Sequence, residues 1–124
     1  MAVAAPPEAS PRLQISVVDA EGRPIAGALI DVYLDNEFVG TITSSGSSLL
    51  EFADPGVTLR LEARIADLKE IREIDARDHA VSFVFTNPPR RLTATIPGGR
   101  CADGTTGQPC VVCRVGGRQV RICG

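Results

Sequence analysis

The sequence of 124 residues contains no tryptophan, one tyrosine and one histidine, and aromatic residues make up only 4% of it. Proteins that bind single-stranded nucleic acid stack the bases on aromatic side chains, so this scarcity argues against a nucleic-acid partner. No apolar run approaches the ~20 residues of a membrane-spanning helix, and we expect no membrane span. With 44% hydrophobic residues the chain can form a compact core, which must consist mainly of valine, isoleucine and leucine.

The first eleven residues are rich in alanine and proline, and they lack the basic start and the apolar stretch of a secretory signal. We therefore expect residues 1–10 to be a flexible N-terminal segment and the protein to be cytoplasmic. The alternative is a mature form whose signal was removed before the numbering begins.

Charge is distributed unevenly along the chain. Residues 1–86 contain 7 Lys and Arg against 14 Asp and Glu, whereas residues 87–124 contain 6 Arg against Asp103 alone. An acidic body with a basic C-terminal segment can fold back on itself or face an acidic partner. The simpler interpretation is an arginine-rich surface exposed to water, which we favour.

The stretch from residue 13 to residue 34 indicates two strands joined by a turn. Apolar and polar residues alternate over 13–18, the period of a half-buried strand. Asp19 can bond its own backbone two residues on, and Gly22 accepts a positive φ without a Cβ clash, so the chain can reverse here. Pro24 has no amide hydrogen for a strand ladder and belongs at a strand edge or start.

This stretch resembles a known family. The pattern Val-x-Asp-x-x-Gly-x-Pro-x-x-Gly-Ala, an alternating strand and a later Gly with nearby Thr is similar to the carboxypeptidase regulatory-like (transthyretin-like) domain. The matching residues are Val17, Asp19, Gly22, Pro24, Gly27, Ala28, Gly40, Thr41 and Thr43. The resemblance covers residues 11–86 and implies an all-β fold, a seven-stranded antiparallel β-sandwich of prealbumin-like or Ig-like form. It also implies an accessory binding or scaffolding role, although a fold alone does not specify an activity.

The later part of this region predicts further strands. Val57–Ile65 alternates most clearly, with its apolar residues facing the core. Residues 66–76 carry apolar side chains at every third position, which is nearer a helical period, but the sandwich needs a strand here. We expect a turn at Ala66–Lys69 and a strand at Glu70–Asp75. Val81–Phe85 closes the sandwich.

After the sandwich domain, residues 87–97 form a Pro- and Arg-rich linker, because consecutive prolines favour an extended chain. Residues 92–96 in this linker can add an edge strand. Residues 98–124 form a small appendage that contains all four cysteines of the protein.

The cysteine spacing is Cys101-x8-Cys110-x2-Cys113-x9-Cys123. A segment of about 26 residues with so few large apolar side chains cannot bury enough surface to fold alone, so we expect its sulfur atoms to be tied together. The spacing favours structural zinc held by four thiolates, with Cys110 and Cys113 in a knuckle that resembles a zinc ribbon. The likeness is incomplete, because a zinc ribbon has two C-x-x-C knuckles.

Two alternatives to zinc remain open for the cysteines, namely disulfides and free or redox-active thiols, and a separate hypothesis concerns cleavage before this segment. The four cysteines can form two disulfides in any of three pairings, which we would expect only in an oxidising compartment and therefore in a secreted or surface protein. The pair Gly98-Gly99 directly before the cysteines also fits the precursor of a Cys-rich peptide that is cleaved after Gly99.

We expect no enzymatic activity. His79 and Tyr33 are the only residues of their types, whereas a transthyretin-like hydroxyisourate hydrolase needs several histidines. The related intradiol dioxygenases bind iron through two Tyr and two His. We therefore assign no catalytic residue, and we predict a non-catalytic binding or scaffolding module that engages a protein partner.

Overall fold

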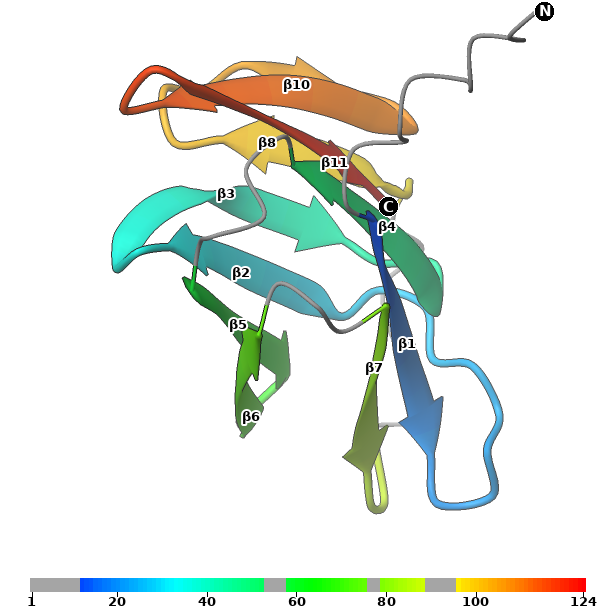
Figure 1. Ribbon diagram of the computed structural model, residues 1–124. Helices are drawn as coiled ribbons and strands as arrows, with labels where there is room; N and C mark the ends of the chain where they lie inside the picture. The colour runs from blue at the N-terminus through cyan, green and yellow to red at the C-terminus, as the bar shows by residue number, and fades with distance from the viewer. Residues whose placement is uncertain (1–11, 53–57, 76–78, 89–95) are drawn as a thin grey trace, which may run out of the picture.

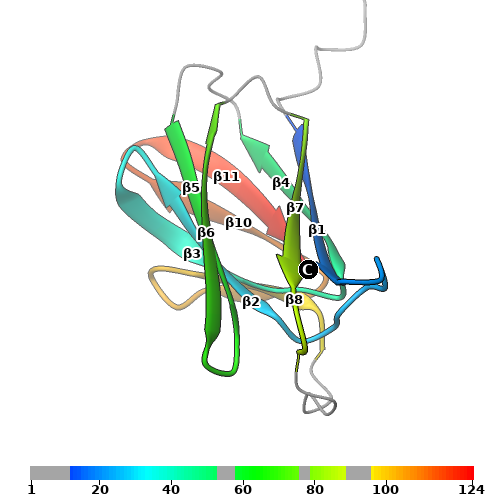
Figure 2. The ribbon, with the colours of Figure 1, turned by 90° about the horizontal axis from the view of Figure 1, so that it is seen from below.

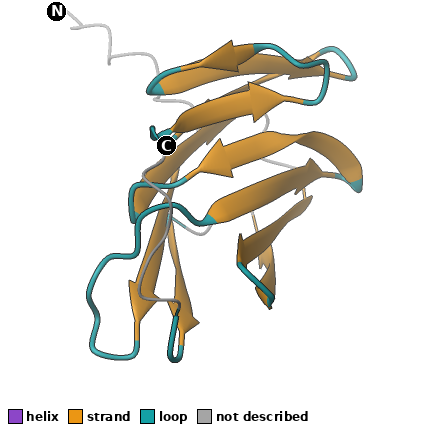
Figure 3. Ribbon diagram, turned by 180° about the vertical axis from the view of Figure 1, so that it is seen from behind, coloured by secondary structure: helices purple, strands orange, loops and turns teal. Residues whose placement is uncertain are grey.

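The computed structural model describes residues 12–52, 58–75, 79–88 and 96–124. These residues form eleven strands and no helix (Figure 3). Accordingly, no helix among them is long and apolar enough to cross a membrane. The strands form two packed sheets, so the predicted all-β sandwich is confirmed (Figures 1 and 2).

The strands follow one another along the chain and are separated by turns or loops. They are β1 (Arg12–Asp19), β2 (Leu29–Leu34), β3 (Glu37–Thr43), β4 (Ser47–Phe52), β5 (Thr58–Ile65), β6 (Leu68–Asp75), β7 (Ala80–Phe85), β8 (Gly98–Cys101), β9 (Thr106–Gly107), β10 (Cys110–Val115) and β11 (Arg118–Cys123).

The two sheets have different numbers of strands. Sheet A has five strands in the order β10-β11-β4-β1-β7, and sheet B has six in the order β6-β5-β2-β3-β8-β9. The strand pairs are antiparallel, except that β1 and β7 run parallel. Seven strands therefore lie in the region of the predicted sandwich domain, and four follow it.

The C-terminal strands belong to the same two sheets as the first seven. Strand β11 pairs with β4 in sheet A, from Val120 opposite Phe52 to Cys123 opposite Leu49. Strand β8 pairs with β3 in sheet B. Figure 1 shows β8, β10 and β11 together at one end of the molecule, beside β3 and β4. Backbone hydrogen bonds thus hold residues 98–124 in place, in addition to any link between sulfur atoms.

The core lies between the sheets and consists mainly of aliphatic side chains, as the composition predicts. The largest fully buried side chains are Phe83, Leu13, Ile15, Ile30, Ile42, Leu50, Leu59, Leu61, Ile65, Ile122, Val17 and Val32. The C-terminal strands add Val111, Val115, Val120 and Ile122 to the same cluster, each 9% exposed or less. A single core therefore underlies both regions.

The turn that opens the family-like motif forms as predicted. One carboxylate oxygen of Asp19 accepts hydrogen bonds from the backbone amides of Glu21 and Arg23, each at 2.9 Å. Gly22 adopts a φ of 83°, and Pro24 forms an isolated bridge to Val18. The Asp-x-x-Gly-x-Pro pattern thus directs the chain from β1 towards β2.

The described part of this ambiguous stretch, residues 66–75, also behaves as predicted, with a strand rather than a helix. Ala66 lies in the turn with a φ of 51°, and β6 begins two residues before the predicted strand. The three-residue spacing is misleading because Ile74 is buried whereas Ile71 is 50% exposed, as alternation in a strand requires. The predicted flexible segment 1–10 and most of the predicted edge strand 92–96 lie outside the described residues.

Candidate functional site

The four cysteines form two disulfides. Cys101 pairs with Cys113 at an S–S distance of 2.08 Å, and Cys110 pairs with Cys123 at 2.06 Å. The prediction of structural zinc is therefore wrong, because zinc needs thiolate ligands and no thiol is left to supply them. Within the described residues, no group of three or more His, Cys, Asp or Glu could hold a metal ion.

The local geometry explains why Cys110 and Cys113 do not form a knuckle. Val111 and Val112 between them are β-branched and favour a strand, and all four residues lie in β10. Residues three positions apart on a strand point to opposite faces of the sheet. The two sulfur atoms therefore cannot converge on one ion, and each finds a partner on a different strand.

The Cys101–Cys113 disulfide lies between the two sheets. Cys101 on β8 belongs to sheet B, Cys113 on β10 belongs to sheet A, and their Cα atoms are 5.3 Å apart. The two residues are 5% and 1% exposed. This bond joins the sheets covalently inside the core.

The Cys110–Cys123 disulfide lies on the other side of sheet A. The two residues are directly opposite each other in the β10–β11 register. The neighbouring row, in which Val111 faces Ile122 and Ile122 faces Leu50, is buried in the core. The disulfide row must then point outward, because adjacent rows of a sheet face opposite ways. Cys110 is partly exposed there.

Two arginines pair with one carboxylate on this outward side of sheet A, and a third arginine lies on the same side. Glu51 on β4 lies opposite Arg12 of β1 on one side and Arg121 of β11 on the other. Its carboxylate oxygens are 3.4 Å from Arg12 Nε and 2.8 Å from Arg121 Nη1. The side chains of Arg12 and Arg121 remain 59% and 50% exposed. Arg114 on β10 is also exposed. We call Arg12, Arg114, Arg121 and Glu51 the arginine face.

The arginine face carries a net positive charge. The other outward side chains of β1, β4, β10 and β11 are uncharged, so three guanidinium groups are set against one carboxylate. Part of the positive charge of the C-terminal segment is therefore neutralised within the fold, because Arg121 pairs with Glu51 of the acidic body. The exposed guanidinium surface that remains can attract an anion.

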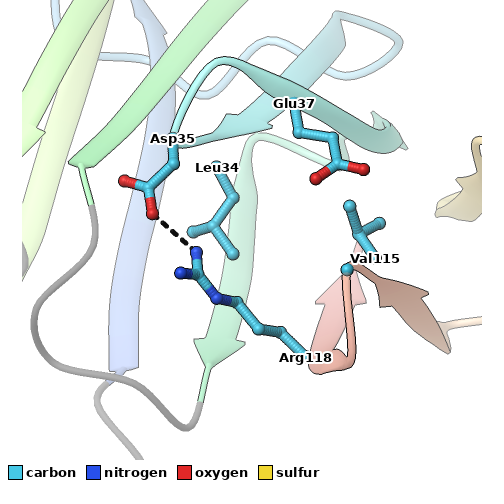
Figure 4. A pocket seen from close by; sticks show the side chains of 6 residues that line it. Leu34, Asp35, Glu37, Val115 and Arg118 are labelled. Carbon is cyan, nitrogen blue, oxygen red and sulfur yellow. Dashed lines mark hydrogen bonds and ion pairs between the residues drawn. The ribbon is translucent and has the colours of Figure 1, made fainter.

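A pocket of about 140 Å³ lies at the hairpin end of the C-terminal strands (Figure 4). Its lining is Leu34, Asp35, Glu37, Val115, Gly116 and Arg118. Asp35 accepts hydrogen bonds from the Thr58 amide at 2.9 Å and from Arg118 Nη1 at 2.6 Å. The Thr58 bond and then the Arg118 bond hold the pKa of the Asp35 carboxyl below its ordinary value. The ion pair thus joins the β2–β3 and β10–β11 hairpins.

Known proteins offer no guide to this site. No protein-family model, curated protein or solved structure matches the chain. What the structure establishes is an all-β, two-sheet sandwich with two disulfides near its C-terminus.

The single histidine and the single tyrosine lie in different parts of the fold. His79 is exposed just before β7 of sheet A, and its backbone carbonyl accepts a hydrogen bond from the Gln14 amide at 2.9 Å. Tyr33 lies in sheet B, with its ring centroid 5.4 Å from that of Phe38 and the Arg60 guanidinium 4.2 Å from it. Both residues therefore have local structural contacts.

Sequence reasoning missed the arginine face. The alternation of polar and apolar residues places Arg12 and Glu51 on the polar faces of their strands, and this is the only indication of the arginine face that the sequence contains. That β4 lies between β1 and β11 is a long-range pairing that no local pattern contains.

Proposed function

We propose that this chain is a non-catalytic binding module, cross-linked by two disulfides, that works in an oxidising compartment as a secreted or surface protein. The pairing of all four cysteines carries the proposal. Structural disulfides form and persist in oxidising compartments and are rare in the cytosol. The pairing therefore favours the secreted alternative over the cytoplasmic location expected from residues 1–10. The turn at Asp19 and Gly22 supports kinship with carboxypeptidase regulatory-like domains.

A thiol and metal analysis of the whole protein tests this proposal. We expect no reactive thiol in denaturant without reductant, no stoichiometric metal, and an intact mass lower than that of the reduced chain by four hydrogen atoms. Protease mapping should link Cys101 to Cys113 and Cys110 to Cys123. Four reactive thiols together with one zinc ion per chain would overturn it.

The arginine face is the surface that we propose for the partner, and an acidic segment of another protein is the ligand that its charge fits. Arg12, Arg114 and Arg121 lie on the outward side of sheet A, and their three positive charges are set against the one negative charge of Glu51, which pairs with Arg12 and Arg121. Guanidinium groups bind carboxylates with directed hydrogen bonds. Complementary charge also speeds encounter and selects against basic partners.

Polyglutamate is a suitable probe for this surface. We expect the wild-type protein to bind it at low salt, with an affinity that falls as the salt concentration rises. The double variant Arg114→Gln/Arg121→Gln should weaken binding by about fivefold or more. The control Lys69→Gln/Arg72→Gln removes the same charge from β6 in sheet B and should change binding by less than about twofold. Equal losses in the two variants would show that net charge, rather than this face, attracts the probe.

The peptide-precursor alternative has less support. Gly98 and Gly99 are buried in β8, which pairs with β3 on one side and with β9 on the other. A protease acting after Gly99 would first have to release this strand from sheet B.

A further inference from the structure

The two disulfides differ in how a thiol can reach them. Cys101 and Cys113 lie between the sheets, 5% and 1% exposed. Cys110 is partly exposed on the outward side of sheet A, whereas its partner Cys123 is 7% exposed. We propose that Cys110–Cys123 is a thiol–disulfide exchange site for small anionic thiols, whereas Cys101–Cys113 is a permanent cross-link.

The direction of attack supports exchange at Cys110. A thiolate attacks a disulfide sulfur from the side opposite the leaving sulfur. The leaving sulfur here belongs to Cys123 on β11, so the thiolate must approach Cys110 from the side of β10 away from β11. Strand β10 is the outermost strand of sheet A, so no further strand of that sheet lies on this path. Gly107 of β9 in sheet B lies beside the Cys110 backbone.

The surrounding charge selects the kind of thiol. Arg121 lies two residues before Cys123 on the same side of β11, a separation of about 7 Å along a strand. Arg114 lies on the same side of β10, four residues from Cys110, a separation of about 13 Å along the strand. These guanidinium groups attract a thiol that carries a carboxylate or sulfonate. Positive charge also stabilises the thiolate that leaves from Cys123.

The exchange balances without any other reactant. The incoming thiolate forms a bond to Cys110 Sγ, the Cys110–Cys123 bond breaks, and Cys123 leaves as a thiolate that takes a proton from water. The product is a mixed disulfide on Cys110. A second thiolate can then attack the sulfur of the bound small thiol. Cys110 leaves as a thiolate, and the small thiol is oxidised to its own disulfide.

The fold does not depend on this bond for its strand pairing. Six residue pairs connect β10 to β11, and four connect β11 to β4. The amide of Gly124 also donates a hydrogen bond to the Pro109 carbonyl at 2.9 Å. Opening Cys110–Cys123 therefore leaves the strands in place, and the modification is reversible.

Three small thiols of different charge test the proposal on the whole oxidised protein. They are 2-mercaptoethanesulfonate (anionic), 2-mercaptoethanol (neutral) and 2-aminoethanethiol (cationic), used at equal thiolate concentration without denaturant. After alkylation, mass mapping should find adducts and label at Cys110 and Cys123 while Cys101 and Cys113 stay paired. At low salt the anionic thiol should react about tenfold faster than the cationic one, and this ratio should approach one at high salt.

Charge variants locate the cause of that preference. Arg121→Gln should lower the anionic-to-cationic rate ratio, whereas the matched variant Arg72→Gln on β6 should leave it unchanged. The proposal fails if exchange needs denaturant, if all four cysteines open together, or if the three thiols react equally at low salt. The exchange experiment uses no polyglutamate. The exchange proposal can therefore hold even if the protein binds no acidic segment.

Discussion

Glu51 on β4 accepts a hydrogen bond from Arg121 on β11 at 2.8 Å, although the two residues are 70 positions apart in the sequence. The same carboxylate lies 3.4 Å from the Arg12 guanidinium on β1. Its side chain is only 15% exposed, so water screens it less than most surface carboxylates. One acidic residue thus connects the first strand to the last described one.

We expect Glu51→Gln to lower the free energy of unfolding by about 1 kcal/mol, because two guanidinium groups lose their shared counter-charge. Urea unfolding at neutral pH and low salt measures this. The matched control is Glu21→Gln, since Glu21 is 68% exposed and 3.5 Å from Arg23, and its effect should be close to zero. Equal losses in the two variants would contradict a special role for Glu51, and high salt should shrink the difference between them.

Local patterns were sufficient for most of the sandwich. One face of β1, β2 and β5 is buried, so their sequences alternate with period two and predict strands directly. The turn after Asp19 was predictable because its hydrogen bonds lie within five residues. In each of these cases the sequence pattern and the structure that it predicts involve the same few neighbouring residues.

The cysteine-rich segment was harder because its structure depends on partners elsewhere in the chain. The same Cys-x2-Cys spacing fits a zinc knuckle or a strand, and pairing of β11 with β4 favours the strand. The segment has too few apolar residues to fold alone, but it folds as part of the common core. Val120 and Ile122 are buried against a core that residues 11–86 supply.

A truncation that ends at residue 97 tests the predicted domain boundary. Besides both disulfides, it removes four buried aliphatic residues of the common core, Val111, Val115, Val120 and Ile122, each of which contributes about 1.5–3 kcal/mol. The total of about 6–12 kcal/mol is comparable to the whole stability of a typical domain. We expect the truncated chain to lose its cooperative thermal transition, whereas deletion of residues 1–10 should preserve it. A cooperative transition in the truncated chain would support an independent domain at 11–86.

Gly99 is expected to tolerate no side chain. A Cβ at this position would lie 2.7 Å from Ile122 Cγ1 and 2.9 Å from Val111 Cγ1. Gly99→Ala should therefore lower the free energy of unfolding by about 1–3 kcal/mol, as overpacking of a core does. The variant Ile122→Val removes the Cδ1 atom, which lies 2.9 Å from the same position. In the Ile122→Val background, Gly99→Ala should lower the free energy of unfolding by less than it does in the wild type. If the effects of the two substitutions were strictly additive, this double-mutant cycle would argue against the contact.

The two disulfides should contribute unequally to stability. Their sequence separations are 12 and 13 residues, so loop entropy alone predicts about 3 kcal/mol for each. Replacing Cys101 and Cys113 by Ala should cost about 1–2 kcal/mol more than replacing Cys110 and Cys123, because it also leaves a cavity between the sheets. Urea unfolding without reductant compares the two variants. A larger loss from the outward pair would contradict the assignment of Cys101–Cys113 as the structural bond.

Asp35 should make stability depend on pH. Its pKa is lowered in the folded protein, first by the Thr58 amide and then by Arg118. A lowered folded pKa means that the carboxylate stabilises the fold above the unfolded pKa, about 4, and that this contribution is lost as the pH falls through the folded pKa. The variant Asp35→Asn should therefore be less stable than the wild type at neutral pH, and the difference should disappear in acid. Denaturant unfolding between neutral and acid pH measures this difference.

Arg118→Gln provides the comparison, because it keeps the Thr58 bond and should reduce the pH dependence without removing it. A difference between wild type and Asp35→Asn that stays constant with pH would show that the Asp35 carboxylate contributes through packing rather than through its charge.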